Sequence, residues 1–205
     1  MSRSGTYHHG DLRAACIRAA RELLEEDGSA GLSLRAVARR AGVSATAPYR
    51  HFADREALVS AVAAEGYNEL AGFLAQAHPA PSTPDALAAV AVAYVRFTLE
   101  HPALFRAMFA EPCDPTSEER VAATAAISEY VRAIVDATFP GVDADALSTT
   151  VWALVHGLAF LHLDGKLDSS TPEIVTAQVT SAVHALFNAA PAMSGTAAAG
   201  LQARV

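Results

Sequence analysis

Several features that define common protein classes are scarce in this sequence of 205 residues. It has two cysteines, Cys16 and Cys113, which are too few for a disulfide-stabilised scaffold, so we expect a reduced, cytoplasmic protein. No apolar stretch free of charges and loop breakers reaches the ~18 residues that suggest a membrane span. The longest candidate, residues 149–163, contains His156, Gly157 and His162. The polar first ten residues lack the apolar segment of a secretory signal, and we expect no membrane contact.

Motifs of catalytic chemistry are also missing. The sequence contains no nucleophile elbow, no phosphate-binding glycine loop and no Cys-x-x-Cys pair. His156 and His162 do not have the spacing of a zinc site, and the aspartates near them fall close to expected helix ends, where acids usually act as caps or are solvated. We therefore expect no metal, no cofactor and no enzymatic activity.

Charge is unevenly distributed along the chain, although the net charge is −7. Residues 1–55 carry nine arginines and six acidic residues, a net charge of +3. Residues 56–205 carry six basic and sixteen acidic residues, a net charge of −10. The basic part can meet phosphates and the acidic part cannot do so easily, which indicates two parts with different roles.

Almost every segment has the apolar periodicity of a helix, and alternating strand patterns are absent. The sequence predicts an all-α protein of about nine helices, separated by Gly and Pro signals, at residues 10–26, 33–41, 44–52, 54–77, 85–100, 102–110, 117–139, 143–163 and 172–189. We expect a DNA-binding domain at residues 1–55, an effector-binding and dimerisation domain at 56–190, and a disordered Ala- and Gly-rich tail at 191–205.

The most informative stretch is residues 33–52. Ser33 is a candidate cap for a short helix, Gly42 permits a sharp turn, and Ser44 is a candidate cap for a second helix. This is the pattern of a helix-turn-helix, whose second helix enters the major groove. The exposed face of that helix would present small or hydrogen-bonding groups, namely Ala45, Thr46, Ala47, Tyr49 and Arg50. The alternative interpretation is a helical hairpin that packs against the rest of the protein and does not bind DNA.

From Leu32 to Leu58 the sequence, LSLRAVARRAGVSATAPYRHFADREAL, resembles the signature of the TetR family of transcriptional regulators, and the resemblance covers about the first 55 residues. It implies that Arg35 contacts a base edge or a phosphate and that Thr46 and Ala47 lie in the groove. It also implies that phosphates are held by Tyr49, Arg50 and His51, and by Arg55 at the positive end of the next helix. The same DNA-facing set includes Ser33, Ser44 and Ala45.

One residue departs from the family pattern, because Pro48 stands where many members carry a bulky aliphatic side chain. Proline is tolerated in a first helical turn, so we still expect the second helix of the motif. A start shifted to Thr46 is the alternative.

For the remainder of the chain, the resemblance implies a domain that binds a small molecule and dimerises. The expected helix at 143–163 is apolar on nearly every side, so one face can line the domain interior while another packs on a second copy, together with the helix at 172–189. The candidate pocket residues are aromatic or apolar with one histidine, which favours an apolar or aromatic effector: Phe73, Tyr94, Phe97, Phe105, Met108, Phe109, Trp152 and His156. Some of these will be ordinary core residues.

The segment Trp152-Ala-Leu-Val-His156-Gly157 resembles the Trp-His-Gly motif of one C-terminal subgroup of the family. Trp152 and His156 are four residues apart and share a helix face. His156 is either a polar group of the pocket or, as we favour, a structural residue bonded to a backbone group, with Gly157 allowing close helix packing.

The preferred hypothesis is a homodimeric repressor that a small molecule releases from a palindromic double-stranded operator. The second hypothesis is a DNA-binding regulator whose C-terminal domain only dimerises or binds a protein partner. The third is a metal-dependent helical enzyme with an incidental hairpin.

Overall fold

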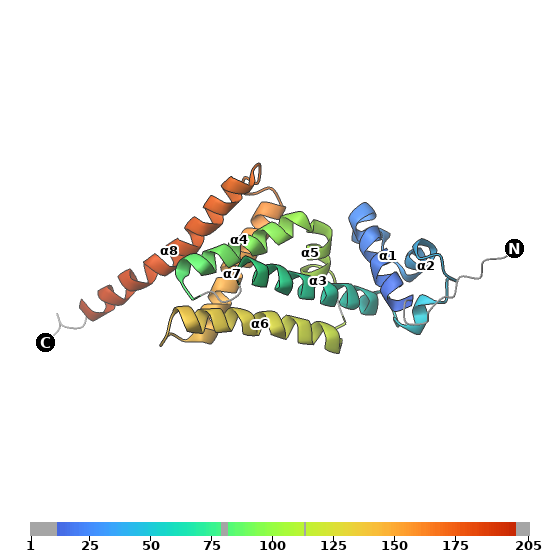
Figure 1. Ribbon diagram of the computed structural model, residues 1–205, viewed down its shortest axis with the longest axis horizontal. Helices are drawn as coiled ribbons and strands as arrows, with labels where there is room; N and C mark the ends of the chain where they lie inside the picture. The colour runs from blue at the N-terminus through green and yellow to red at the C-terminus, as the bar shows by residue number, and fades with distance from the viewer. Residues whose placement is uncertain (1–11, 79–81, 113, 200–205) are drawn as a thin grey trace. The chain divides into compact units, whose positions relative to one another are not determined.

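The computed structural model describes residues 12–78, 82–112 and 114–199, with the backbone alone for 189–199. Within these ranges every regular element is helical, and no strand occurs (Figure 1). The elements are eight α-helices and two short 3-10 helices, in the order α1 (Leu12–Asp27), η1 (Ser29–Gly31), α2 (Leu34–Arg40), η2 (Pro48–Arg50), α3 (Arg55–Ala77), α4 (Pro84–Glu100), α5 (Pro102–Phe109), α6 (Glu118–Thr138), α7 (Ala144–Leu163) and α8 (Pro172–Ala199). The all-α class is confirmed, and the expected count of about nine helices is one too high.

Helix α2 begins and ends where its cap residues predict. The Ser33 hydroxyl accepts a hydrogen bond from the Ala36 amide at 3.2 Å, which satisfies one of the unpaired amides of the first turn. At the other end Gly42 adopts a φ of 68°. The Gly42 amide donates to Arg39 and the Val43 amide donates to Ala38, at 3.3 and 3.0 Å. This pair of bonds is the Schellman ending, which favours glycine because of its positive φ.

The expected α-helix at residues 44–52 is wrong. An α-helix there would need the residue 48 amide to bond to the Ser44 carbonyl, but proline has no amide hydrogen. The Ser44 carbonyl instead accepts from Ala47 at 2.9 Å, and a separate turn, η2, begins at Pro48. The Ser44 hydroxyl lies 3.4 Å from the Thr46 hydroxyl, and neither side chain caps η2, so both expected helix starts fail. We call residues 44–51 the recognition segment.

The expected tail also differs from the structure. Helix α8 continues to Ala199, so residues 191–199 are helical rather than disordered. Four of these nine residues are alanines, which have the highest helix propensity and favour a helix in spite of Pro191 and Gly195. Residues 200–205 of the expected tail lie outside the described residues.

The chain forms two compact units, and they do not divide at residue 55. The first unit contains residues 1–69 and 101–125, and the second contains 70–100 and 126–205. Helix α3 begins at Arg55, and its first part, up to Glu69, belongs to the first unit together with α5 and the start of α6. The DNA-binding role of residues 1–55 stays a prediction.

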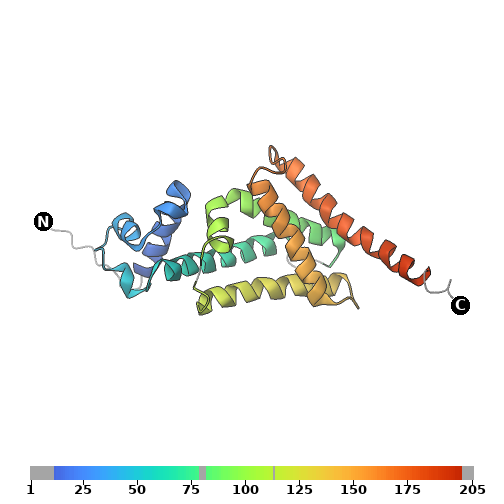
Figure 2. The same cartoon turned by 180° about the vertical axis from the view of Figure 1, so that it is seen from behind.

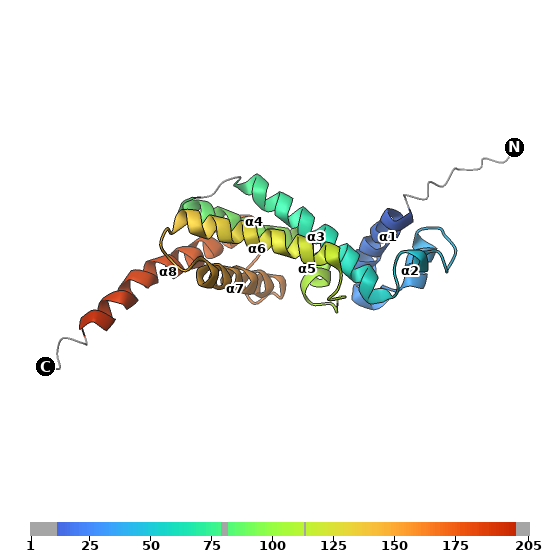
Figure 3. The ribbon, with the colours of Figure 1, turned by 90° about the horizontal axis from the view of Figure 1, so that it is seen from below.

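In the first unit, α1 packs against α2, η1, η2 and α5 (Figures 1 and 3). The face of α1 that repeats every three to four residues is buried and forms the centre of this unit, with Cys16, Ile17, Ala20, Leu23 and Leu24. Helix α3 approaches α5 closely at Gly66, where an added Cβ would lie 2.7 Å from Met108 Sδ. The Tyr67 hydroxyl donates to the Met108 carbonyl at 3.0 Å, which fixes the same contact.

In the second unit, α4 packs against both α7 and α8, and α7 packs against α8 (Figures 1 and 2). Helix α4 is buried on most of its surface, including Tyr94, Val95 and Phe97. Helix α7 begins at Asp143, whose carboxylate accepts from the Asp145 and Ala146 amides at 3.1 Å.

Candidate nucleic-acid interface and effector cavity

The recognition segment presents its polar side chains to solvent. Ala45, Thr46, Arg50 and His51 are exposed, Ala47 is half-buried, and the Tyr49 side chain is 52% exposed. Pro48 and Phe52 are buried in the first unit and hold the segment on α1 and α2. An exposed segment of this composition can approach base edges and phosphates.

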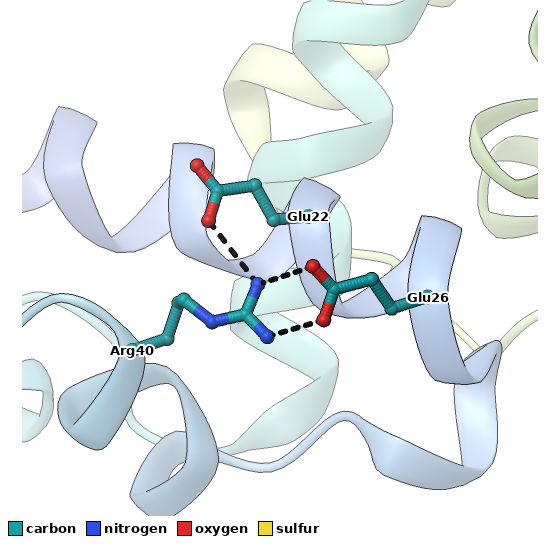
Figure 4. A network of polar contacts seen from close by, with 3 residues as sticks. All are labelled: Glu22, Glu26 and Arg40. Atoms are coloured by element: carbon teal, nitrogen blue, oxygen red, sulfur yellow. Dashed lines mark hydrogen bonds and ion pairs between the residues drawn. The ribbon is translucent and has the colours of Figure 1, made fainter.

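The arginines of α2 have two different environments. Arg35 and Arg39 are exposed. Arg40 turns to α1, where its guanidinium donates to Glu22 at 3.2 Å and to Glu26 at 3.1 Å (Figure 4). These bonds tie α2 to α1, and they raise the pKa of Arg40, so this side chain holds the motif together.

Arg55 lies at the expected start of α3, but its guanidinium makes internal bonds. It donates to the Leu32 carbonyl at 3.2 Å, to the Ser29 carbonyl at 3.1 Å and to the Glu111 carboxylate at 2.9 Å. The bond to Arg55 holds the pKa of Glu111 below its ordinary value. The structure therefore gives Arg55 a role inside the first unit, and its phosphate contact stays a prediction. Likewise, the Ser33 hydroxyl is engaged in the α2 cap.

The second unit encloses an apolar cavity of about 40 Å³. Its lining comes from α3, α4, α6 and α7, and consists of Leu74, Leu87, Val90, Ala91, Tyr94, Ile127, Val131, Ile134, Val151, Trp152 and Val155. A volume of this size holds about one water molecule, whereas sites for drug-sized ligands span about 300–1,000 Å³. The cavity is therefore nearly closed in this structure.

A hydrogen-bonded pair borders this cavity. The Tyr94 hydroxyl lies 2.9 Å from His156 Nδ1. The Trp152 ring lies beside the His156 ring, with 5.3 Å between centroids, as expected for residues that share a helix face. Burial lowers the pKa of His156, so its ring is neutral at pH 7. Trp152 is 47% exposed although it also lines the cavity, so its indole lies at the cavity edge.

The structure does not bring all eight expected pocket residues together. Tyr94 and Trp152 line the cavity, and His156 is hydrogen-bonded to Tyr94. Phe73 and Phe97 pack on each other in the second unit, with ring centroids 5.8 Å apart. The other three lie in the first unit, where Phe109 packs on Phe105 and Tyr67, and Met108 accepts the Tyr67 hydrogen bond: Phe105, Met108 and Phe109.

The aliphatic residues that line the cavity were not predicted from the sequence, nor was the exposed Arg39 beside the recognition segment. The apolar periodicity marks Leu74, Ile127 and Ile134 as buried but does not indicate which helices meet at a cavity. Arg39 could have been found, since it lies two residues after the buried Val37 and so on the opposite, solvent-facing side of α2. In the described part of the chain, no three His, Cys, Asp or Glu side chains gather in a group that could hold a metal ion.

Two family models match this chain over successive ranges. The model for bacterial regulatory proteins of the tetR family matches residues 17–62, which contain α2 and the recognition segment. The model for the tetracyclin repressor-like C-terminal domain matches residues 87–186, which contain α4 to α7 and the start of α8. Together these ranges cover more than half of the chain.

Two solved structures are similar to this chain over most of its length. A solved protein of unknown function from a Rhodococcus species is 36% identical, with a TM-score of 0.74, covering 89% of this chain and 98% of that one. A TetR family regulator from Thermus thermophilus is 21% identical, with a TM-score of 0.60, covering 82% of this chain and 97% of that one, and shows the fold alone.

An HTH-type transcriptional regulator of Mycobacterium tuberculosis is 31% identical over 104 residues, which are 49% of this chain and 44% of the relative. The matched region thus spans less than half the length of that curated relative. The two family models, one on the helix-turn-helix and one on the helices around the cavity, show that this chain belongs to the TetR family of DNA-binding transcriptional regulators.

Proposed function

We propose that the protein is a dimeric repressor that binds a palindromic operator and is released from it by a small apolar effector. The observation that carries this proposal is the exposure of the recognition segment next to Arg35 and Arg39, whereas Arg40 and Arg55 of the same unit make internal bonds. In each subunit the recognition segment would enter a major groove. The two half-sites would lie about one helical turn apart, near 34–36 Å, or a multiple of that distance.

Operator binding is the first test. Duplexes from the region upstream of the chain's own gene would be titrated at fixed salt, because affinities without a stated salt concentration cannot be compared. Replacing Arg35, Tyr49 and Arg50 together by alanine should abolish specific binding. The matched control replaces Arg96 and Arg132 by alanine, since both are exposed in the second unit. Operator binding that survives the triple substitution would refute the assignment of these DNA contacts.

The exposed faces of α7 and α8 support dimerisation through these two helices. On α7, Thr150, Ala153, Gly157 and Leu161 are exposed and recur every three to four residues. A Cβ added to Gly157 would meet no atom within 4 Å, so this small face is open to a close partner. A shallow groove runs along the outer face of α8, lined by small and polar residues that include Thr176, Ala177, Thr180, Ser181 and Ala185.

Helix α7 needs such a partner for a further reason. Among the described residues it is the one helix long and apolar enough to cross a membrane, judged by length and composition alone. Only part of its surface is buried within this chain, and Trp152 and Leu161 are 47% and 43% exposed. We attribute its apolar character to the second-unit core on one side and to a second copy of the chain on the other.

The apolar cavity is the proposed effector site. Because it holds about 40 Å³, an effector must enlarge it, and the least costly movement is that of the half-exposed Trp152. A ligand shifts the DNA-bound state only through its different affinity for the closed and enlarged forms. The lining favours an apolar ligand with one hydrogen-bonding group directed to Tyr94 and His156. The Trp152–His156 contact also supports placement in the Trp-His-Gly subgroup.

Trp152 is the single tryptophan of the chain and therefore reports on this site by its own fluorescence. A panel of apolar compounds with one polar group would be screened for a change in emission and, in parallel, for release of the operator. A compound active in both assays should lose affinity in Tyr94→Phe, which removes the hydroxyl bonded to His156. Arg96→Ala, at an exposed position of the same helix as Tyr94, is the control.

A regulator that only dimerises or binds a protein partner is the second candidate, and the small size of the cavity favours it. In that case operator binding and dimerisation would both be observed, while no compound would change Trp152 emission and DNA affinity together.

A further inference from the structure

We propose that Pro48 determines which DNA sequence this protein reads, by dividing the recognition segment into two separate turns. This inference rests on the proposed function as a DNA-binding regulator. It concerns the shape of the element that meets the bases, and the family resemblance alone would make that element one short α-helix.

The backbone bonds of the segment show the division. The Ala47 amide bonds to Ser44, the Arg50 amide to Ala47, and the His51 amide to Pro48, at 2.9, 3.2 and 2.9 Å. Each of these bonds spans three residues, as in a 3-10 turn, instead of the four of an α-helix. Only Phe52, which donates to the Pro48 carbonyl at 3.0 Å, spans four. The first turn ends at Ala47, and the second turn, η2, begins at Pro48.

Burial keeps Pro48 in place. Pro48 is buried, and η2 packs against both α1 and α2, so the ring belongs to the first-unit core. It starts η2 at a position where a missing amide hydrogen costs nothing. Phe52 directly follows the segment, and its side chain is 2% exposed. The Arg13 guanidinium lies over the Phe52 ring, 5.8 Å from the ring centre. Buried residues at both ends fix the second turn.

The division changes which side chains can act together. In a continuous α-helix, Thr46 would share one face with Tyr49 and Arg50, since they are three and four residues away. In the structure, Thr46 lies on the first turn, and Tyr49 and Arg50 lie on the second, where side chains repeat every three residues. The two groups therefore face the DNA from separate turns. Pro48 acts as a positioning residue for both groups.

The test compares the sequences that each variant selects from a pool of randomised duplexes. Pro48→Ala and Pro48→Leu restore the amide hydrogen, and the leucine also keeps a bulky apolar side chain in the buried position. Both should enrich a consensus that differs from that of the unsubstituted protein and should bind the original consensus about tenfold more weakly or worse. Affinity for random duplex should stay within about twofold, because phosphate contacts are sequence-independent.

The control is Pro84→Ala, the exposed first residue of α4 in the second unit, which should leave the selected sequence unchanged. Thermal melting identifies a variant that fails to fold. If only Pro48→Ala unfolds, Pro48→Leu decides; if both unfold, Pro48 is a structural residue and the proposal is wrong. The proposal would also be wrong if a folded Pro48 variant selected the same consensus as the unsubstituted protein and bound it with the same affinity. If the unsubstituted protein enriches no sequence, the proposed function itself has failed.

Discussion

At the scale of single residues, five arginines of the helix-turn-helix region and the start of α3 divide into two groups. Arg40 and Arg55 donate to carboxylates and carbonyls of their own unit, whereas Arg35, Arg39 and Arg50 are exposed. The sequence alone cannot make this division, because the carboxylate partner of Arg55 is Glu111, fifty-six positions further along the chain. The partners of Arg40 lie on the preceding helix.

This division predicts different responses to salt. A phosphate contact contributes about one unit to the slope of log affinity against log salt. Arg50→Gln, and independently Arg39→Gln, should each lower that slope by about one. Arg40→Gln should leave the slope unchanged even if it weakens binding. The measurement is fluorescence anisotropy of a labelled duplex over a series of salt concentrations, and equal slopes for all three variants would contradict the division.

His156 gives a second prediction at this scale. Burial lowers its pKa in the folded protein, so the unfolded chain, with a pKa of about 6.5, binds the proton more readily. Its contribution to stability is therefore complete above about pH 6.5 and is lost as the pH falls. The melting temperature should drop between about pH 7.5 and pH 5.5, and it should drop less in His156→Gln.

His162 is buried as well and its pKa is lowered by burial, so His162→Gln should reduce the same drop. The exposed His51→Gln serves as the control. A drop of equal size in all variants would show that other groups, not these two histidines, cause the pH dependence.

At the scale of elements, sequence patterns predicted the positions of most helices well, but they predicted poorly which helices pack against one another. The caps at Ser33, Asp54 and Asp143 lie where helices α2, α3 and α7 begin, because side-chain caps are local interactions. The helix expected at 44–52 failed because one missing amide hydrogen at Pro48 outweighed the periodicity around it. The aromatic residues of α5 were expected in the pocket, since periodicity reports burial without reporting the partner.

The contact between α3 and α5 predicts that alanine substitutions at two glycines of α3 change the free energy of unfolding in opposite directions. Gly66→Ala would place a Cβ 2.7 Å from Met108 Sδ and 3.0 Å from Leu104 Cδ1, and should destabilise the protein by about 1–3 kcal/mol. Gly72→Ala meets no atom within 4 Å and should stabilise it by about 0.5–1 kcal/mol, because alanine favours helix over glycine. Urea unfolding of both variants measures the difference, and destabilisation of similar size at both positions would contradict it.

At the scale of the whole molecule, a chain with a net charge of −7 must bind a polyanion. The first 55 residues carry the positive charge, and one copy offers only a short exposed segment to the groove. Two linked copies gain affinity because the second half-site is bound at high effective concentration. Dimerisation is therefore required for operator affinity in the proposed function, and its loss should be visible without any change in the recognition segment.

Gly157→Arg tests this requirement. The side chain meets no atom of its own chain near the Cβ position, so each copy should fold, while a charged side chain on the exposed α7 face should prevent pairing. The matched control is Gly72→Arg, because Gly72 is likewise exposed, helical and open. Light scattering after size-exclusion chromatography should show a monomer for Gly157→Arg and a dimer for the control. Operator affinity should fall by about a hundredfold or more only in the monomer, since it loses the linkage between half-sites. A dimeric Gly157→Arg would place the interface elsewhere, and a monomer with full operator affinity would show that one recognition segment suffices.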